Sequence, residues 1–296
     1  MQYAVRAGWD PQRGVDFFEV LDRQQQESGQ SLPSWLSTHP APADRVVRTR
    51  QLAASAQTGA ALRSGEASHK GHVEGLVFGD NPRQGFFDGS TFKHPDEAFL
   101  LRFPAGWETR NTPMAVLAVD PQRQARLQLT VEDAAGASPP AYLRALATTV
   151  GAEILGVREE TIGGRAAALA ELRLTSDEGP TTLQLAAIGR PQTRTVFQIV
   201  GVAATSFGSW QPVFVQCMRS FAPLRERADL EVQPNRVRIV RLDRAQSLGD
   251  AAARFKDVPV PLATLALLNN VQTNATLDAG FRVKLVRGAY RASGSP

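Results

Sequence analysis

The chain has 296 residues, of which 43% are hydrophobic and 21% are charged. This balance is typical of a globular protein and leaves room for two or three domains. No stretch approaches the roughly 18 consecutive apolar residues of a membrane-spanning helix, so we expect no transmembrane segment, and we identify no secretory signal. The single cysteine excludes an internal disulfide and a metal site made of several cysteines.

The formal net charge is +4, and the surplus lies in residues 226–296, which hold 11 Lys and Arg against 7 Asp and Glu. These basic residues are dispersed, as in "NRVRIVRLDRAQ", and no aromatic residues alternate with them. Nucleic-acid interfaces carry denser basic patches, so we expect no nucleic-acid partner. Mild attraction to an acidic polymer such as a cell-wall glycan, or to an anionic lipid surface, stays open.

The first 64 residues predict helices. Asp10 and Pro11 form an N-cap followed by a proline at the first helical position, and apolar residues then recur at helical spacing. A second helix is expected to begin within "STHPAPADRVVRTRQLAASA". These signals predict a helical N-terminal part.

Residues 65–78 predict a linker. The segment "SHKGHVE" brings His69 and His72 three residues apart, which would place both on one face of a helix. Its glycine and polar residues favour an exposed turn instead, so we expect neither a helix nor a metal site there.

Residues 79–225 predict an antiparallel sheet covered by helices. Compact or alternating apolar runs indicate strands at "AFLLRF", "MAVLAV", "RLQLTVE", "AAALAELRL", "TTLQLAAIG" and "TRTVFQIVGVA". One helix is expected after Ser138 and a closing helix near residues 209–220. Cys217 lies in the closing helix at helical spacing from apolar residues, which predicts a buried structural thiol.

Residues 226–296 predict a small βααβ unit. "VRIVRL" and "AGFRVKLV" indicate its strands, and "SLGDAAARF" and "PLATLALLNNV" indicate its helices. The fold class predicted for the whole chain is α+β: a helical N-terminal part, an antiparallel sheet covered by helices, and this C-terminal unit. The predicted division is 1–64, a linker at 65–78, 79–225 and 226–296.

Within residues 1–64, "YAVRAGWDPQRGVDFFEVL" and "STHPAPADRV" resemble the end of the catalytic domain of HtpX-like and BepA-like zinc metallopeptidases, relatives of the CAAX prenyl endopeptidases. In that family the A-G-[YW]-D-P segment follows the helix whose glutamate is the third zinc ligand. The resemblance implies that His39 lines the zinc cleft as a candidate accessory ligand. It also implies that Arg45 lies on the same wall as a structural or substrate-positioning cation.

The chain departs from this family in its chemistry. The peptidases use H-E-x-x-H, in which two histidines bind zinc and the glutamate is the general base, and this motif occurs nowhere in the sequence. We therefore expect no catalytic residue and no complete metal site in this chain alone, with zinc belonging to the intact family domain. The third-ligand glutamate would lie upstream of Met1, which indicates a late start codon, a frameshift or a reduced paralogue; we favour the late start.

The middle segment, from "FKHPDEAFLLRFPAGWETRN" to "FVQCMRSFAPL", resembles PsbP-like α/β domains in its opening strand, its proline-glycine-tryptophan turn and its final Ser-Phe pair. The resemblance implies a binding or docking module without catalytic residues. We expect Trp107 to anchor the core and His94 to cap the entry to the first strand.

The C-terminal unit resembles LysM, a module associated with glycans that contain N-acetylglucosamine. "LALLNNV" and "LDAGFRVKLV" match its second helix and closing strand, but the usual Gly-Asp-Thr turn is absent. The resemblance implies Ser247 and Asn269 as glycan-binding residues. A purely structural role for the unit stays open.

These patterns together predict the non-catalytic C-terminal part of a zinc-dependent metalloendopeptidase of the bacterial envelope, acting in the periplasm or at the cell envelope. Its partners would be the peptide or protein substrate of the intact enzyme and a cell-wall glycan. Two alternatives stay open: a stand-alone envelope or peptidoglycan-binding module, and a regulator that completes the active-site wall of another metallopeptidase.

Overall fold

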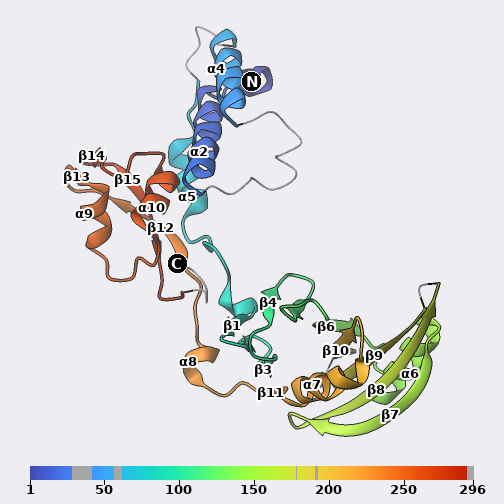
Figure 1. Ribbon diagram of the computed structural model, residues 1–296. Helices are drawn as coiled ribbons and strands as arrows, with labels where there is room; N and C mark the ends of the chain where they lie inside the picture. The colour runs from blue at the N-terminus through green and yellow to red at the C-terminus, as the bar shows by residue number, and fades with distance from the viewer. Residues whose placement is uncertain (29–41, 57–61, 178, 191–192, 292–296) are drawn as a thin grey trace. The chain divides into compact units, whose positions relative to one another are not determined.

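The computed structural model describes residues 1–28, 42–56, 62–177, 179–190 and 193–291. Its helices and antiparallel strands confirm the predicted α+β class. The chain folds as two compact units, shown in Figure 1: unit 1 combines Met1–Asp80 with Pro234–Ala289, and unit 2 combines Asn81–Gln233 with Tyr290–Pro296. The four-part division of the sequence stays a prediction, since compactness does not show which parts fold independently.

Unit 2 is built on a seven-stranded antiparallel sheet with the strand order β4-β5-β6-β10-β9-β8-β7. The strands are β4 (Glu108–Asn111), β5 (Val116–Val119), β6 (Ala125–Asp133), β7 (Glu153–Ile162), β8 (Arg165–Ser176), β9 (Gly179–Gly189) and β10 (Thr195–Ala203). Five of the six apolar runs predicted as strands correspond to β5, β6, β8, β9 and β10, and the sixth, "AFLLRF", to β3 (Phe99–Arg102) of a second sheet, so those predictions are confirmed.

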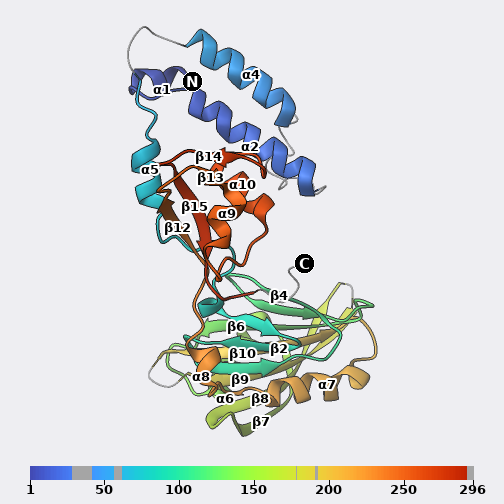
Figure 2. The same ribbon diagram turned by 90° about the vertical axis from the view of Figure 1, so that its left-hand side faces the viewer.

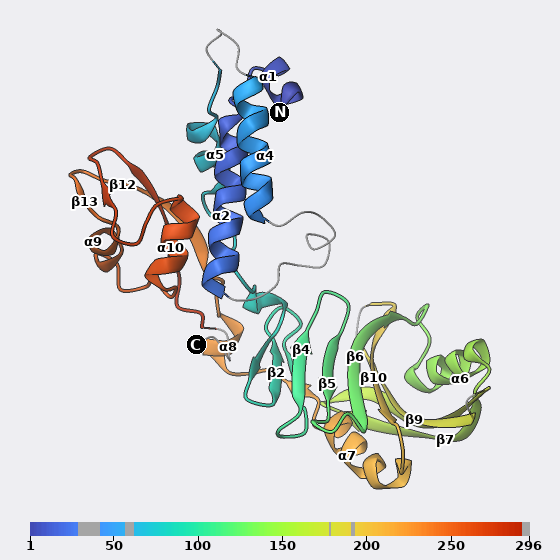
Figure 3. The ribbon, with the colours of Figure 1, turned by 45° about the horizontal axis from the view of Figure 1, so that its top comes forward.

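Helices α6 (Pro139–Val150) and α7 (Phe207–Arg219) cover opposite faces of this sheet (Figure 3). Successive strand residues point to opposite faces, and β8 shows this directly. Ala168 and Ala170 belong to the apolar core under α6, whereas Ala167 and Leu169 belong to the core under α7. The central strands are therefore apolar on both faces, which explains why their sequences read as continuous apolar runs.

A second, four-stranded sheet with the order β1-β2-β3-β11 packs on the same face as α7. Its strands are β1 (Phe86–Asp88), β2 (Thr91–His94), β3 (Phe99–Arg102) and β11 (Ala222–Pro223), with the short helices η1 (Pro82–Gln84) and α8 (Arg227–Leu230) nearby in the chain. Phe99, Phe197 and Phe221 meet between the two sheets. Their ring centroids lie 4.8 Å (Phe99–Phe197), 4.8 Å (Phe99–Phe221) and 5.2 Å (Phe197–Phe221) apart. We refer to these residues as the phenylalanine triad.

The edge strand β7 was not predicted from the sequence. It pairs with β8 alone and contains a register shift between Ile154 and Gly156. Most of its residues are exposed, including Ile154 at 40% and Leu155 at 36%. An edge strand of which most residues are exposed lacks the alternation on which a strand prediction depends.

Unit 1 contains the helices α1 (Gln2–Arg6), α2 (Gln12–Ser28) and α4 (Pro42–Ser55), which confirm the predicted helical N-terminal part. Helices α2 and α4 lie side by side, with Val15 of α2 and Ala53 of α4 fully buried (Figure 3). In the described part of the chain, no helix is both long and apolar enough to cross a membrane.

The predicted βααβ order is confirmed in the second half of unit 1. It consists of β12 (Arg236–Arg241), α9 (Leu248–Ala253), α10 (Leu262–Asn269) and β15 (Arg282–Arg287), with the short strands β13 (Gln246–Ser247) and β14 (Thr276–Leu277). Strands β12 and β15 pair antiparallel along their whole length, as Figure 2 shows. Buried leucine, valine and alanine side chains from the strands and both helices form its core.

The expectation that no helix forms around His69 and His72 was wrong, because helix α5 (Glu66–Val73) spans this segment. Its Lys70 is buried, and the Nζ atom lies 4.7 Å from the centroid of the Phe281 ring. The chain after α5 then pairs with β12, where the Gly75 N–H donates to the Val237 carbonyl at 2.8 Å. Tertiary contacts therefore order a segment whose own propensity for structure is weak.

Because α7 packs closely on β10, we predict that one methyl group added to β10 destabilises the fold. A Cβ added at Gly201 would lie 2.5 Å from the Phe214 ring, whereas one added at Gly208 of α7 would meet nothing within 4 Å. We expect Gly201→Ala to lower the free energy of unfolding by about 1–3 kcal/mol, because the ring cannot move out of the core. Urea unfolding checks this, with Gly208→Ala as the control; equal stability of the two variants would contradict the packing.

Candidate functional site

The residues that the metallopeptidase resemblance singles out lie in or before α4. His39 lies outside the described residues. Arg45 lies in the first turns of α4 and is half-buried. The roles predicted for both residues therefore stay predictions.

The A-G-W-D-P segment forms a corner between α1 and α2. Gly8 has a φ of +77°, in the left-handed region that favours glycine. The Asp10 Oδ1 atom accepts a hydrogen bond from the Gln12 N–H at 2.9 Å and so caps α2. The Arg63 guanidinium lies 4.4 Å from the centroid of the Trp9 ring, and the Asp10 N–H donates to the Arg63 carbonyl at 3.0 Å. Gly8, Trp9 and Asp10 of the motif therefore each make a structural contribution within unit 1.

The two residues predicted to bind glycan have structural partners. The Ser247 Oγ atom caps α9 by accepting from the Asp250 N–H at 3.0 Å and donates to the Asp250 carboxylate at 2.7 Å. The Asn269 side chain donates to the carbonyls of Leu265 and Lys284 and accepts from the Lys284 N–H, at 2.8, 2.8 and 2.7 Å. Asn269 thus holds α10 against β15. Glycan binding by this pair stays a prediction.

Among the described residues there is neither a reactive thiol nor a metal centre. Cys217 is 3% exposed, which confirms the predicted buried thiol, and burial raises its pKa to about 12. Within residues 1–28, 42–56, 62–177, 179–190 and 193–291, no group of three His, Cys, Asp or Glu side chains is placed to hold a metal ion. Those residues therefore do not fit zinc, and the expectation of zinc in an intact family domain stays a prediction.

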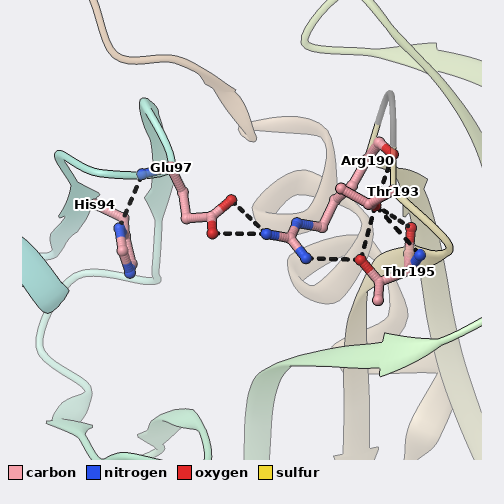
Figure 4. Close-up of polar contacts among 5 residues, drawn as sticks. All are labelled: His94, Glu97, Arg190, Thr193 and Thr195. Carbon is pink, nitrogen blue, oxygen red and sulfur yellow. Dashed lines mark hydrogen bonds and ion pairs between the residues drawn. The ribbon is translucent and has the colours of Figure 1, made fainter.

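A polar cluster in unit 2 is the candidate site. It joins the turn between β2 and β3 to the connection between β9 and β10, and it is shown in Figure 4. Its members are His94, Glu97, Arg190, Thr193 and Thr195, which we call the Arg190 cluster. These segments are far apart in the sequence and come together where Phe99 of β3 packs on Phe197 of β10.

The Arg190 guanidinium is fixed from three sides. Its Nη2 atom donates to both carboxylate oxygens of Glu97, at 2.6 and 2.7 Å, and its Nη1 atom donates to the Thr195 hydroxyl at 2.6 Å. Its Cζ atom lies over the Phe197 ring, 5.0 Å from the ring centroid. The Thr193 hydroxyl donates to the Arg190 carbonyl at 2.8 Å and so closes the turn. An arginine held in this way is pre-organised, and little side-chain entropy is lost when a ligand binds.

His94 caps the turn that carries Glu97, as the sequence predicted for the entry to this strand. Its Nδ1 atom accepts a hydrogen bond from the Glu97 N–H at 3.2 Å, and its ring stacks on Phe99 with centroids 5.6 Å apart. Burial lowers the pKa of His94, and the nearby carboxylates of Glu97 and Asp96 oppose that shift. Because Glu97 is paired with arginine and His94 accepts from the backbone, the cluster is suited to binding rather than to proton transfer.

The sequence reasoning did not single out Glu97 or Arg190. One signal was present: Arg190 directly follows a glycine at the end of a buried apolar strand, where a charged side chain can remain near the surface while the strand is buried. Its carboxylate partner lies 93 residues away in the sequence, and no local pattern reports such a pair.

The chain matches no protein-family model and no curated protein. Several solved structures resemble part of it. Cyanobacterial PsbP (CyanoP) from Synechocystis is similar over 46% of this chain and 94% of that chain, at 12% identity and a TM-score of 0.38. The Ran-binding protein Mog1p from Saccharomyces cerevisiae is similar over 46% and 96%, at 15% identity and a TM-score of 0.35. LpqN from Mycobacterium tuberculosis is described as involved in cell envelope biogenesis. It is similar over 47% of this chain and 87% of its own chain, at 12% identity and a TM-score of 0.33.

These likenesses carry no conclusion on activity, partner or location, because the TM-scores are only 0.33 to 0.38. One of these structures is a PsbP, the family that the middle segment resembles in sequence. The HtpX-like and LysM-like resemblances stay predictions.

The lowered pKa of His94 predicts a pH-dependent stability. The ordinary pKa is 6.5 and the folded value lies below it, so the unfolded chain binds the proton more tightly. The stabilisation from neutral His94 is therefore complete above about pH 6.5 and is lost as the pH falls through the lower folded value. Urea unfolding of unit 2 at a series of pH values checks this.

In the same series, His94→Gln should remove this pH-dependent component, because the amide oxygen can accept from the Glu97 N–H without titrating. His72→Gln, a change at an exposed position of α5 in unit 1, should leave it in place. An unchanged pH profile in His94→Gln would show that the dependence arises elsewhere.

Proposed function

We propose that this chain is the non-catalytic part of a zinc-dependent metalloendopeptidase of the bacterial envelope, and that helices α2 and α4 dock on the peptidase domain. The proposal rests on the resemblance of residues 1–64 to the end of that domain. The observation that carries it is the unusual exposure of apolar side chains on these helices.

Three large apolar side chains of the α2–α4 pair are exposed. Phe17 of α2 is 57% exposed, and Val47 and Leu52 of α4 are 54% and 48% exposed. Helices stabilised by packing normally keep such residues on the buried face, so large exposed apolar side chains on both helices indicate an interaction surface. A peptidase domain is the occupant that the neighbouring A-G-W-D-P corner favours, since this corner belongs to that domain in the family.

The periplasmic or envelope location is part of the same proposal. It rests on the resemblance of residues 1–64 to an envelope peptidase domain and of the C-terminal unit to LysM. The role assigned to unit 2 is to bind a ligand or substrate for the peptidase, since the Arg190 cluster is arranged for binding.

The first test is genetic and then biochemical. A reading frame that encodes H-E-x-x-H is expected beside the gene for this chain, in the same or a shifted frame. Where the frame is separate, its product should co-purify with the chain, and Phe17→Asp should weaken the association by at least about tenfold, because a charge would be buried at the interface. Met114→Asp, at a residue 85% exposed in unit 2, is the control. Absence of such a frame, or binding that Phe17→Asp leaves unchanged, would refute the proposal.

A second candidate function is glycan binding by unit 1, and a cavity of about 480 Å³ favours it. Glu19, Asp22, Arg23 and Arg50 line it from α2 and α4, and residues 270–272 line it from the loop after α10. Arg23 donates to the Val271 carbonyl at 3.1 Å. Ligand sites commonly fall in the range of roughly 300–1,000 Å³, and converging polar groups suit the hydroxyl groups of a sugar.

Calorimetric titration with oligomers of N-acetylglucosamine tests the second candidate. Asp22→Asn should weaken binding by about tenfold, because a carboxylate accepts stronger hydrogen bonds from sugar hydroxyls than an amide does. Asp243→Asn, at an exposed aspartate elsewhere in unit 1, should bind as the wild type does. A titration without saturable heat would remove this candidate.

A further inference from the structure

A small cavity of about 190 Å³ opens beside the Arg190 cluster in unit 2. Three arginines line it: Arg165 at the start of β8, Arg190 after β9 and Arg194 before β10. The rest of its lining consists of small or uncharged residues, namely Gly136, Ala137, Ala166, Gly189, Thr193, Thr195 and Val196. Among the described residues that line the cavity, none is acidic.

Arg165 is held in place by aromatic rings. Its guanidinium carbon lies 5.5 Å from the centroid of Phe197 and 5.7 Å from that of Phe221, two members of the phenylalanine triad. Within the described part of the chain, its side chain makes no hydrogen bond and no ion pair. The five N–H groups of its guanidinium therefore keep their capacity to bind an acceptor. Burial lowers the pKa of Arg165, and the charge of Arg190 adds to this shift while the charge of Glu97 opposes it.

The local backbone fixes where Arg165 lies. A two-residue turn, Gly163-Gly164, joins β7 to β8, and both glycines have positive φ, at 58° and 77°. A Cβ at Gly163 would lie 2.8 Å from the Phe221 carbonyl oxygen, so the turn packs directly on the chain that carries the triad. Arg165 follows this turn immediately and is held at the rim of the cavity.

The charges at the cavity are unbalanced. Of the three arginines, Arg190 is paired with Glu97, whereas the side chains of Arg165 and Arg194 form no ion pair with any described residue. The surplus around the cavity is therefore two positive charges. A phosphate monoester carries about −1.5 to −2 charges at neutral pH and three acceptor oxygens, whereas a carboxylate or a phosphate diester carries only one charge. The guanidinium fork also matches phosphate geometry.

We propose that the cavity lined by Arg165, Arg190 and Arg194 is a binding site for a phosphate monoester group, either free phosphate or the terminal phosphate of a larger ligand. Arg165 and Arg194 bind the phosphate oxygens, and Arg190, fixed by Glu97, supplies a third, pre-organised donor edge. The small lining residues leave room for the group, and the open mouth lets the remainder of a ligand extend into solvent.

Calorimetric titration of the full chain tests this site, in buffer of about 20 mM ionic strength to limit screening. The probes are inorganic phosphate, glycerol phosphate, dimethyl phosphate and acetate. Inorganic phosphate and glycerol phosphate should bind saturably, and the two singly charged probes should bind at least about tenfold more weakly. Equal affinity for the two dianions would assign the site to phosphate itself. Tighter binding of glycerol phosphate would assign it to an ester.

Three variants make the test specific. Arg165→Gln should raise the Kd for phosphate by about tenfold or more, and Arg194→Gln, at an exposed position, should raise it without affecting folding. Arg110→Gln, on the distant edge strand β4, makes the same charge change and should bind as the wild type does. Thermal unfolding of each variant separates loss of binding from loss of fold. Wild-type affinity in both Arg165→Gln and Arg194→Gln, or acetate bound as tightly as phosphate, would overturn the proposal.

This site is independent of the proposed docking of α2 and α4. Its residues all lie in unit 2, so a failure of the peptidase association would leave the phosphate titration unchanged.

Discussion

The packing of Phe99, Phe197 and Phe221 is the interaction on which the binding surface of unit 2 depends. The three rings come from β3, from β10 and from the segment that follows α7, and each ring is at most 1% exposed. Burial of large aromatic side chains with centroids about 5 Å apart is strongly stabilising, so this contact joins the small sheet to the large one. The same rings then carry the guanidinium groups of Arg165 and Arg190 on their faces.

This arrangement explains how three arginines can lie together when only one carboxylate of the described residues is paired with them. A guanidinium over an aromatic face gains electrostatic stabilisation without giving up its hydrogen-bond donors. Glu97 forms its ion pair with Arg190, its charge also acts on Arg165, and its own N–H is held by His94, which accepts from it. The result is a surface with fixed geometry and spare positive charge, which is the combination that recognition of a small dianion requires.

The sequence predicted those parts of the fold that express themselves as local patterns. The central strands could be read from their continuous or alternating apolar runs, and α6, α7 and the βααβ order from apolar runs bounded by capping and turn residues. Strand β7 could not be read, since it is an exposed edge, and α5 could not, since Lys70 and the pairing with β12 order it only in the tertiary structure. The candidate site was missed for a related reason: Glu97 and Arg190 meet across 93 residues, and Arg165 is marked only by the glycine turn before it. The residues taken from resemblance have a different status. Asn269 and the Trp9 corner are engaged in structural contacts, while His39 lies outside the described residues.

The central claim of this account is that aromatic rings hold Arg165 ready to bind a doubly charged phosphate group. The most direct measurement follows the guanidinium Nε–Hε resonances of the isotopically labelled full chain by NMR during a titration with inorganic phosphate. The resonances of Arg165 and Arg190 should shift together and saturate, while that of Arg110 stays in place. If the Arg165 resonance does not move, or moves no more than that of Arg110, the claim is wrong.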